Sequence, residues 1–190
     1  MDGVDVKDYS FDALYNKLGY VTQKAVLFSG SVKENILFGE SGAPATDETV
    51  DQAIRLAQAE EFVGKMEEGT DHYIAQGGRN VSGGQKQRLS IARALARNAE
   101  ILVFDDSFSA LDYRTDAALR AGLNESLRDT TKIIVAQRIS TIRHADRILV
   151  LDEGRIVGSG THGELMKNCP VYREIAGSQR SRQELEKEEA

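Results

Sequence analysis

The sequence predicts an α/β fold in which a parallel sheet is covered by helices. Short apolar or β-branched runs alternate along the chain with segments of helical periodicity. The runs lie at residues 19–21, 101–104, 132–136 and 148–151. The helical segments lie at residues 46–60, 82–96, 112–127 and 162–168. Because apolar runs separated by amphipathic helices are typical of parallel strands buried on both faces, we expect helices on both sides of the sheet.

A turn sequence in the last quarter of the chain predicts an antiparallel ribbon. Asp152-Glu153-Gly154 separates the apolar run 148–151 from residues 155–157. Since glycine suits a tight hairpin turn, the two flanking runs should pair with each other and add a ribbon to the sheet.

Two other segments lack strand or core-helix character. Residues 41–47 are small and polar and include a proline, which predicts a surface loop before a helix capped near Thr46 or Asp47. From Ser178 onward the chain is almost purely polar and charged, which predicts a frayed helix or a disordered tail. We therefore treat residues 178–190 as a charged C-terminal tail.

Composition narrows the class of protein. A chain of 190 residues is long enough for one domain with a real core. The net charge of −6 argues against a partner such as nucleic acid, which is bound through a broad basic face. The longest apolar runs have four residues, whereas a membrane span needs about 20. The single cysteine, Cys169, fits a reducing compartment.

The most specific segment is Ser-Gly-Gly-Gln-Lys-Gln-Arg at residues 82–88, which leads into a predicted helix. Ser82 can cap that helix, and Gln85 can complete a capping box. Gly83 and Gly84 leave the backbone N–H groups of the first turn open to a ligand, so this helix end could bind the γ-phosphate of a nucleotide. An isolated Ser-x-x-Gln would more often only cap a helix.

Two carboxylates follow the predicted strand at residues 101–104. Asp105 and Asp106 would lie at the carboxyl edge of the sheet, where ligands of α/β folds bind. Carboxylate oxygens suit Mg²⁺, a hard cation. The alternative is a strand that simply ends in an acidic turn.

Gln23 follows another short strand, at residues 19–21. A lone glutamine in that position would usually be a solvated turn residue. The sequence after it, Leu-Phe-Ser-Gly-Ser-Val-Lys-Glu-Asn-Ile at residues 27–36, is long and distinctive.

These segments together resemble the nucleotide-binding domain of exporter-type ABC transporters. Residues 82–95 resemble the signature motif, and Ser-Ala-Leu-Asp at residues 109–112 resembles the D-loop, which places Asp112 among the expected nucleotide-binding residues. In this resemblance Asp105 is the Walker B aspartate that holds Mg²⁺, and Gln23 is the Q-loop glutamine that reaches the same ion. The segment after the Q-loop glutamine implies contact with transmembrane coupling helices.

The resemblance runs from residue 2 to about residue 178 and implies a fold. It implies a P-loop NTPase-like parallel sheet core, with a helical subdomain over about residues 31–97 that carries the signature. We expect residues 1–177 to form a partial ABC ATPase domain.

One expected motif is missing from these residues. Gly78 and Gly83 have the Gly-x₄-Gly spacing of a phosphate loop, but Gly84-Gln85 follows in place of Lys-Ser or Lys-Thr. We therefore expect the N-terminal β-subdomain and the phosphate loop to be absent from this sequence.

Two catalytic positions depart from the pattern of hydrolytic members. Asp106 stands where these carry glutamate. Because aspartate is shorter by one methylene, its carboxylate would be displaced by about 1 Å, and a displacement of that size can lower the catalytic rate about 10²-fold. Residues 135–141 resemble the switch region, but Gln137 replaces its histidine. A glutamine amide can hydrogen-bond a γ-phosphate but cannot carry a titratable proton or a positive charge. Both changes resemble the degenerate half of bacterial heterodimeric multidrug exporters.

The resemblance implies an ATP- and Mg²⁺-dependent ATPase of an exporter, at the cytoplasmic face of the cell membrane. Its partners would be a second nucleotide-binding domain, whose ATP site the signature completes, and the transmembrane domains. Two other interpretations of the function remain. A chromosome-maintenance or DNA-repair ATPase would need a long coiled coil, and no heptad run occurs here. A non-hydrolytic ATP-gated clamp would differ from the exporter ATPase only in that it does not turn over ATP.

Overall fold

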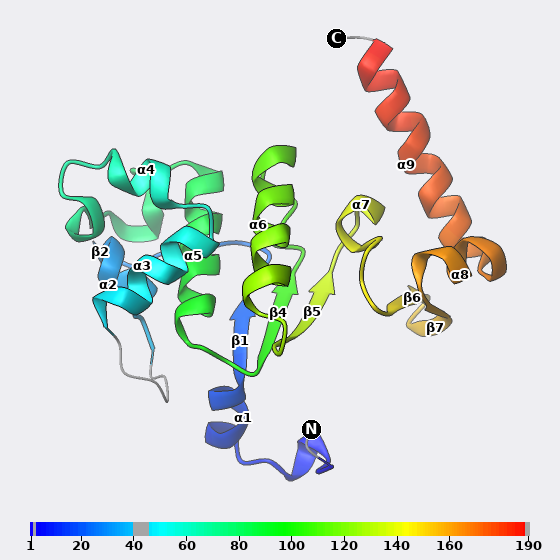
Figure 1. The fold of residues 1–190 in the computed structure, drawn as a ribbon, viewed down its shortest axis with the longest axis horizontal. Coiled ribbons are helices and arrows are strands. Elements are labelled where there is room, and N and C mark those ends of the chain that lie inside the picture. The colour runs from blue at the N-terminus through cyan, green and yellow to red at the C-terminus, as the bar shows by residue number, and fades with distance from the viewer. Residues whose placement is uncertain (2, 40–45, 189–190) are drawn as a thin grey trace. The chain divides into compact units, whose positions relative to one another are not determined.

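The computed structural model describes residues 1, 3–39 and 46–188 (Figure 1). These residues form two compact units, Met1–Val135 and Ala136–Ala190. Each unit has its own hydrophobic core.

The first unit is built on a parallel sheet of three strands. They are β1 (Leu18–Val21), β4 (Ile101–Asp105) and β5 (Thr131–Val135), in the order β1-β4-β5. Val21 pairs with Phe104, so the strands end close together at their carboxyl edge. The three predicted strands and their parallel arrangement are therefore confirmed.

Helices and a short ribbon complete the first unit (Figure 1). The α-helices are α1 (Phe11–Lys17), α2 (Val32–Ile36), α3 (Asp47–Leu56), α4 (Glu60–Gly64), α5 (Gly83–Ala96) and α6 (Tyr113–Ser126). Single 3₁₀ turns lie at Val6–Asp8, Gly69–Asp71 and Gln76–Gly78. The ribbon pairs β2 (Gly30–Ser31) with β3 (Tyr73–Ile74) in antiparallel fashion.

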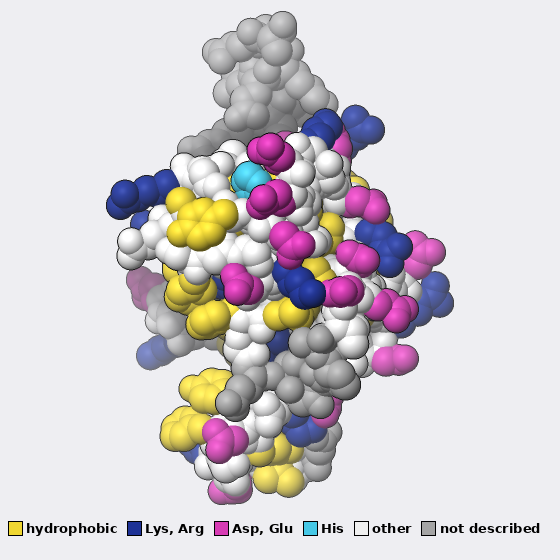
Figure 2. Space-filling model, turned by 90° about the vertical axis from the view of Figure 1, so that its left-hand side faces the viewer, with side chains coloured by type: hydrophobic (Ala, Val, Ile, Leu, Met, Phe, Trp, Pro, Cys, Tyr) yellow, Lys and Arg dark blue, Asp and Glu magenta, His cyan; other side chains and the backbone are white. Residues whose placement is uncertain are grey.

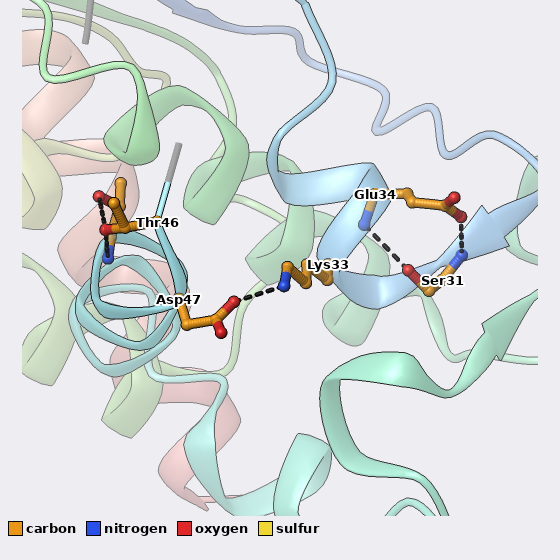
Figure 3. Close-up of polar contacts among 6 residues, drawn as sticks. Ser31, Lys33, Glu34, Thr46 and Asp47 are labelled. Atoms are coloured by element: carbon orange, nitrogen blue, oxygen red, sulfur yellow. Dashed lines mark hydrogen bonds and ion pairs between the residues drawn. The ribbon is translucent and has the colours of Figure 1, made fainter. Parts of the chain in front are cut away.

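Helices α2 and α3 are capped and joined by polar contacts (Figure 3). The backbone N–H of Ser31 donates to Glu34 Oε2 at 2.7 Å, and the Glu34 N–H donates to Ser31 Oγ at 3.0 Å. Thr46 caps α3, as predicted. Lys33 of α2 forms an ion pair with Asp47, the first residue of α3, and this hydrogen bond raises the pKa of Lys33.

The predicted helix over residues 46–60 is wrong in its extent, because the segment forms two helices. Helix α3 ends at Leu56, and Gln58 adopts a left-handed backbone conformation with φ 56° before α4 begins at Glu60. The turn buries Ala57 and Ala59 in the core. Burial of these small side chains favours the break over a continuous helix.

The expectation that both faces of the parallel sheet are buried is wrong for the described residues. Val21, Leu102 and Phe104 point into the core, which also contains side chains of α5 and α6. On the other face Ile133 and Val135 are 50% and 52% exposed. Within the first unit, the described helices therefore cover only one face of β5.

The second unit contains a hairpin and three helices. Its elements are α7 (Ile139–Ile142), β6 (Ile148–Asp152), β7 (Arg155–Gly160), α8 (His162–Asn168) and α9 (Pro170–Glu188). The segment expected to be a frayed helix or a tail from Ser178 lies within α9 as far as Glu188.

The hairpin turn is confirmed, but the ribbon does not extend the parallel sheet. Asp152 pairs with Arg155, and the two turn residues Glu153 and Gly154 have positive φ values of 45° and 75°, as a type I′ turn requires. Among the described strands, β6 and β7 form a separate two-stranded sheet. The reason is that alternate residues of β6 pack into the second core, which includes Tyr172.

The surface of the described part of the chain is mixed in character (Figure 2). On the side that carries α2 and α4, acidic and basic side chains are interspersed with exposed hydrophobic groups (Figure 2). None of the described helices combines the length and apolar character that crossing a membrane requires.

Candidate functional site

The glycine-rich segment begins helix α5 in the predicted way. The backbone N–H of Ser82 donates to Gln85 Oε1 at 2.8 Å, and the Gln85 N–H donates to Ser82 Oγ at 3.3 Å. This confirms the capping box. A Cβ added at Gly83 would meet no atom within 4 Å, so the backbone of this turn is open to close approach. A Cβ at Gly84 would lie 3.6 Å from the Ala110 carbonyl oxygen.

Arg88 fixes the first turns of α5. Its guanidinium donates to the carbonyl oxygen of Gln58 at 2.8 Å and lies 4.6 Å from the centre of the Phe62 ring. It also donates through Nε to the Gly84 carbonyl oxygen at 3.3 Å. Partial burial lowers the pKa of Arg88. The left-handed turn at Gln58 thus presents a carbonyl group to helix α5.

Gln87 connects α5 to the loop that carries Gln23. The Gln87 side chain is buried, and its Nε2 donates to the Thr22 carbonyl oxygen at 3.4 Å. Helix α5 also packs against β1, the strand that precedes this loop. The residue next to Gln23 is therefore held by α5, the helix that Ser82 caps.

Three of the predicted residues meet at the carboxyl edge of the sheet. Gln23 follows β1, and Asp105 is the last residue of β4. Gln23 Nε2 donates to Asp106 Oδ2 at 3.2 Å. Asp106 has a positive φ of 44°, and its N–H donates to the Val135 carbonyl oxygen at 2.9 Å. This turn places the Asp106 carboxylate toward Gln23.

Tyr20 belongs to the same cluster, and the sequence reasoning missed it. Its hydroxyl donates to Asp105 Oδ2 at 2.9 Å. This hydrogen bond, with smaller contributions from desolvation and from the charge of Asp105, raises the pKa of Tyr20. The sequence places Tyr20 in one strand and Asp105 at the end of another, but only the register of the two strands brings them together.

Asp112 and Gln137 lie in other surroundings. Asp112 caps α6, accepting the Thr115 hydroxyl at 2.7 Å and the Thr115 N–H at 2.9 Å. These hydrogen bonds lower the pKa of Asp112. Gln137 belongs to the second unit, where its carbonyl oxygen accepts from Gln179 Nε2 at 2.6 Å. Their assignment to a nucleotide site stays a prediction.

The donor set at the sheet edge fits a hard cation. Asp105, Asp106 and Gln23 offer two carboxylates and one amide oxygen, which are ligands that Mg²⁺ accepts. The described residues contain no group of three or more His, Cys, Asp or Glu that could hold a metal by itself. Such a set suits Mg²⁺, which keeps several waters and is usually bound through one or two carboxylates together with substrate phosphates.

Comparison with known proteins shows relatives that are similar over most of this chain. An ABC transporter ATP-binding protein of Mycobacterium tuberculosis is 47% identical over 182 residues, which cover 94% of this chain and 31% of that protein. A Staphylococcus aureus protein named for multidrug export, an ATP-binding/permease protein, is 43% identical over 92% of this chain and 30% of its own length. This chain therefore spans about a third of the length of these relatives.

A solved structure is also similar. A bacterial Atm1-family ABC exporter with ATP bound matches 94% of this chain and 31% of its own, with a TM-score of 0.88 and 37% identity. The predicted α/β, P-loop NTPase-like fold class is thereby confirmed. Residues 1–109 match the model of the family described as ABC transporter. On this evidence the chain belongs to the ABC transporter family.

Proposed function

We propose that this chain is part of the ATP-binding domain of an ABC exporter, and that it couples ATP binding and hydrolysis to export across a membrane. The observation that carries the proposal is the meeting of Gln23, Asp105 and Asp106 at one sheet edge. Further support comes from the capped, open beginning of α5 and from relatives named for multidrug export. Residues 1–177 form the domain, with a helical subdomain over about 31–97.

In this proposal the start of α5 completes the ATP site of a second nucleotide-binding domain. Ser82, Gly83, Gly84 and Gln85 would face the γ-phosphate, because a capped helix start with accessible N–H groups attracts an anion. Asp112 would approach the same interface from the D-loop.

The site on the chain's own sheet edge takes ATP together with Mg²⁺, which would neutralise phosphate charge. Asp105 and Gln23 are the proposed metal-binding residues. Asp106 and Gln137 occupy the catalytic positions but are poorly suited to them. Asp106 has a short carboxylate that already accepts a hydrogen bond from Gln23, and Gln137 cannot carry a titratable proton.

A heterodimer follows from these assignments. The partner's own catalytic residues, in the site completed by Ser82, would carry out most of the hydrolysis. The chain would act at the cytoplasmic face of the cell membrane through the transmembrane domains of the same transporter. The substrate would be set by those membrane domains.

ATP turnover of the complete transporter tests the proposal. Ser82→Arg should nearly abolish turnover, because the larger side chain would block closure over the partner's γ-phosphate. Asp106→Ala should change it much less. Removing a working catalytic carboxylate typically costs several powers of ten, so the contrast should be clear. Ser10→Arg is the matched control, since Ser10 also caps a helix, α1.

The opposite result would overturn the assignment. If Asp106→Ala abolishes turnover and Ser82→Arg leaves it intact, the competent site is the one on this chain. If Ser10→Arg reduces turnover as much as Ser82→Arg, the loss reflects helix capping and not phosphate binding.

A further inference from the structure

Tyr20 and Asp105 lie on one face of the parallel sheet. Tyr20 of β1 is paired in register with Val103 of β4, and Asp105 follows Val103 by two residues. Because side chains alternate along a strand, Val103 and Asp105 point to the same side. The tyrosine ring can therefore reach along the strand to the carboxylate, and its hydroxyl donates to Oδ2 at 2.9 Å.

We propose that Tyr20 is a positioning residue that orients the Asp105 carboxylate for a divalent cation. The hydroxyl engages Oδ2 and leaves Oδ1 to the ion. The proposal rests on the function proposed above, in which Asp105 binds Mg²⁺. Carboxylates that bind metals are commonly held by a second hydrogen-bonding group, whose loss costs about 10–100-fold in affinity or activity.

The position of Tyr20 in a strand suits it to hold the carboxylate in one orientation. Its backbone is fixed in β1 by the pairing with β4, and a tyrosine side chain has only two rotatable bonds to fix. Tyr20 is 54% exposed, so packing in the core does not explain why a tyrosine stands at this position. A hydrogen bond to a charged carboxylate is about twice as strong as one between neutral groups.

The neighbouring carboxylate is held differently. Asp106 accepts from Gln23, a loop residue, at 3.2 Å, whereas Asp105 accepts from a strand residue at 2.9 Å. Since Gln23 is itself a proposed metal-binding residue, the Gln23 contact can be exchanged when an ion enters, but the Tyr20 contact can persist.

The test is Mn²⁺ binding to the complete transporter, measured by electron paramagnetic resonance with a non-hydrolysable ATP analogue present. Mn²⁺ replaces Mg²⁺ as the probe. Tyr20→Phe removes only the hydroxyl and should raise the Kd for Mn²⁺ about 10-fold at one of the two nucleotide sites. The other site is an internal reference. Tyr15→Phe is the matched control, because Tyr15 is also an exposed tyrosine, in α1.

Asp105→Asn separates this proposal from the one it rests on. If Asp105→Asn loses Mn²⁺ at one site but Tyr20→Phe binds as the unmodified protein does, Asp105 is a ligand and the positioning role is overturned. If Asp105→Asn also binds Mn²⁺ normally, the metal role of Asp105 fails, and the positioning role falls with it. An equal loss in Tyr15→Phe would show a nonspecific effect and would also overturn the role of Tyr20.

Discussion

The guanidinium of Arg93 donates to both oxygens of Asn35, at 2.7 Å to the backbone carbonyl and at 3.0 Å to Oδ1. Arg93 lies in α5, the helix that resembles the signature motif, and Asn35 lies in α2, in the segment that follows Gln23. Asn35 is buried, and its side chain also accepts the Phe28 N–H at 2.9 Å. The two segments that define the resemblance to ABC exporters are thus joined inside one unit.

Replacing Arg93 with alanine should destabilise the chain by about 2–4 kcal/mol, because carbonyl acceptors of Asn35 and Val26 would lose their charged donor. The guanidinium also lies 5.3 Å and 5.6 Å from the ring centres of Phe28 and Phe38. Urea unfolding of the purified chain measures the change. Arg93→Lys should recover only part of the loss, since a lysine ammonium lacks the planar fork.

Arg55 provides the control for that measurement. It lies in the last turn of α3 with an exposed side chain, and Arg55→Ala should change stability by less than about 0.5 kcal/mol. If Arg93→Ala is no more destabilising than Arg55→Ala, the Arg93 network contributes nothing to stability.

Alanine substitutions at Ser107 and at Ser109 should change the stability of the chain differently. The Ser107 hydroxyl is fully buried and makes no hydrogen bond among the described residues, so Ser107→Ala should be neutral or stabilising by about 1 kcal/mol. The Ser109 hydroxyl donates to the Asp106 carbonyl oxygen at 2.7 Å, so Ser109→Ala should cost about 1 kcal/mol. Thermal unfolding of both variants checks the pair. If Ser107→Ala loses more stability than Ser109→Ala, the Ser107 hydroxyl has a hydrogen-bond partner.

Much of this fold could be predicted from local patterns. Strands β1, β4 and β5, the Ser82 and Thr46 caps and the turn at Glu153 and Gly154 each depend on a few neighbouring residues. Such features are encoded by strand alternation, capping chemistry and backbone preference. The predicted meeting of Gln23 with the two aspartates followed from the motif that they resemble, and not from spacing.

The missed features depend on contacts between distant residues. The hydrogen bond from Tyr20 to Asp105 needs the register of two strands that are far apart in sequence. The break at Gln58 depends on the burial of its neighbours in a shared core and on the Arg88 guanidinium that its carbonyl accepts. The exposure of Ile133 and Val135 cannot be predicted from residue type, because both side chains are as apolar as those of buried strand residues.

A polypeptide of these 190 residues should bind ATP weakly. The sequence contains no Gly-x₄-Gly-Lys-Ser or Gly-x₄-Gly-Lys-Thr, and the N–H groups and lysine of such a loop supply most contacts to the β- and γ-phosphates. We expect no micromolar affinity in calorimetry with Mg²⁺ present, and no measurable hydrolysis. Micromolar binding that is lost in Asp105→Asn would show that the sheet edge holds ATP without a phosphate loop.

Adjacent isoleucines of β5 allow a sharp test of the sheet's two faces. Ile133 is 50% exposed, whereas Ile134 is partly buried and packs against the core of the first unit. Threonine keeps the β-branched shape that strands favour but is more polar. Ile133→Thr should therefore leave the thermal midpoint of the 190-residue chain nearly unchanged and should reduce self-association, since exposed apolar sheet surface promotes aggregation. Ile134→Thr should lower the midpoint, because it places a hydroxyl against apolar neighbours. Sedimentation velocity and thermal unfolding of the two variants at equal concentration give the comparison. If Ile133→Thr destabilises the chain as much as Ile134→Thr does, both faces of β5 are buried in solution and the one-sided sheet described here is wrong.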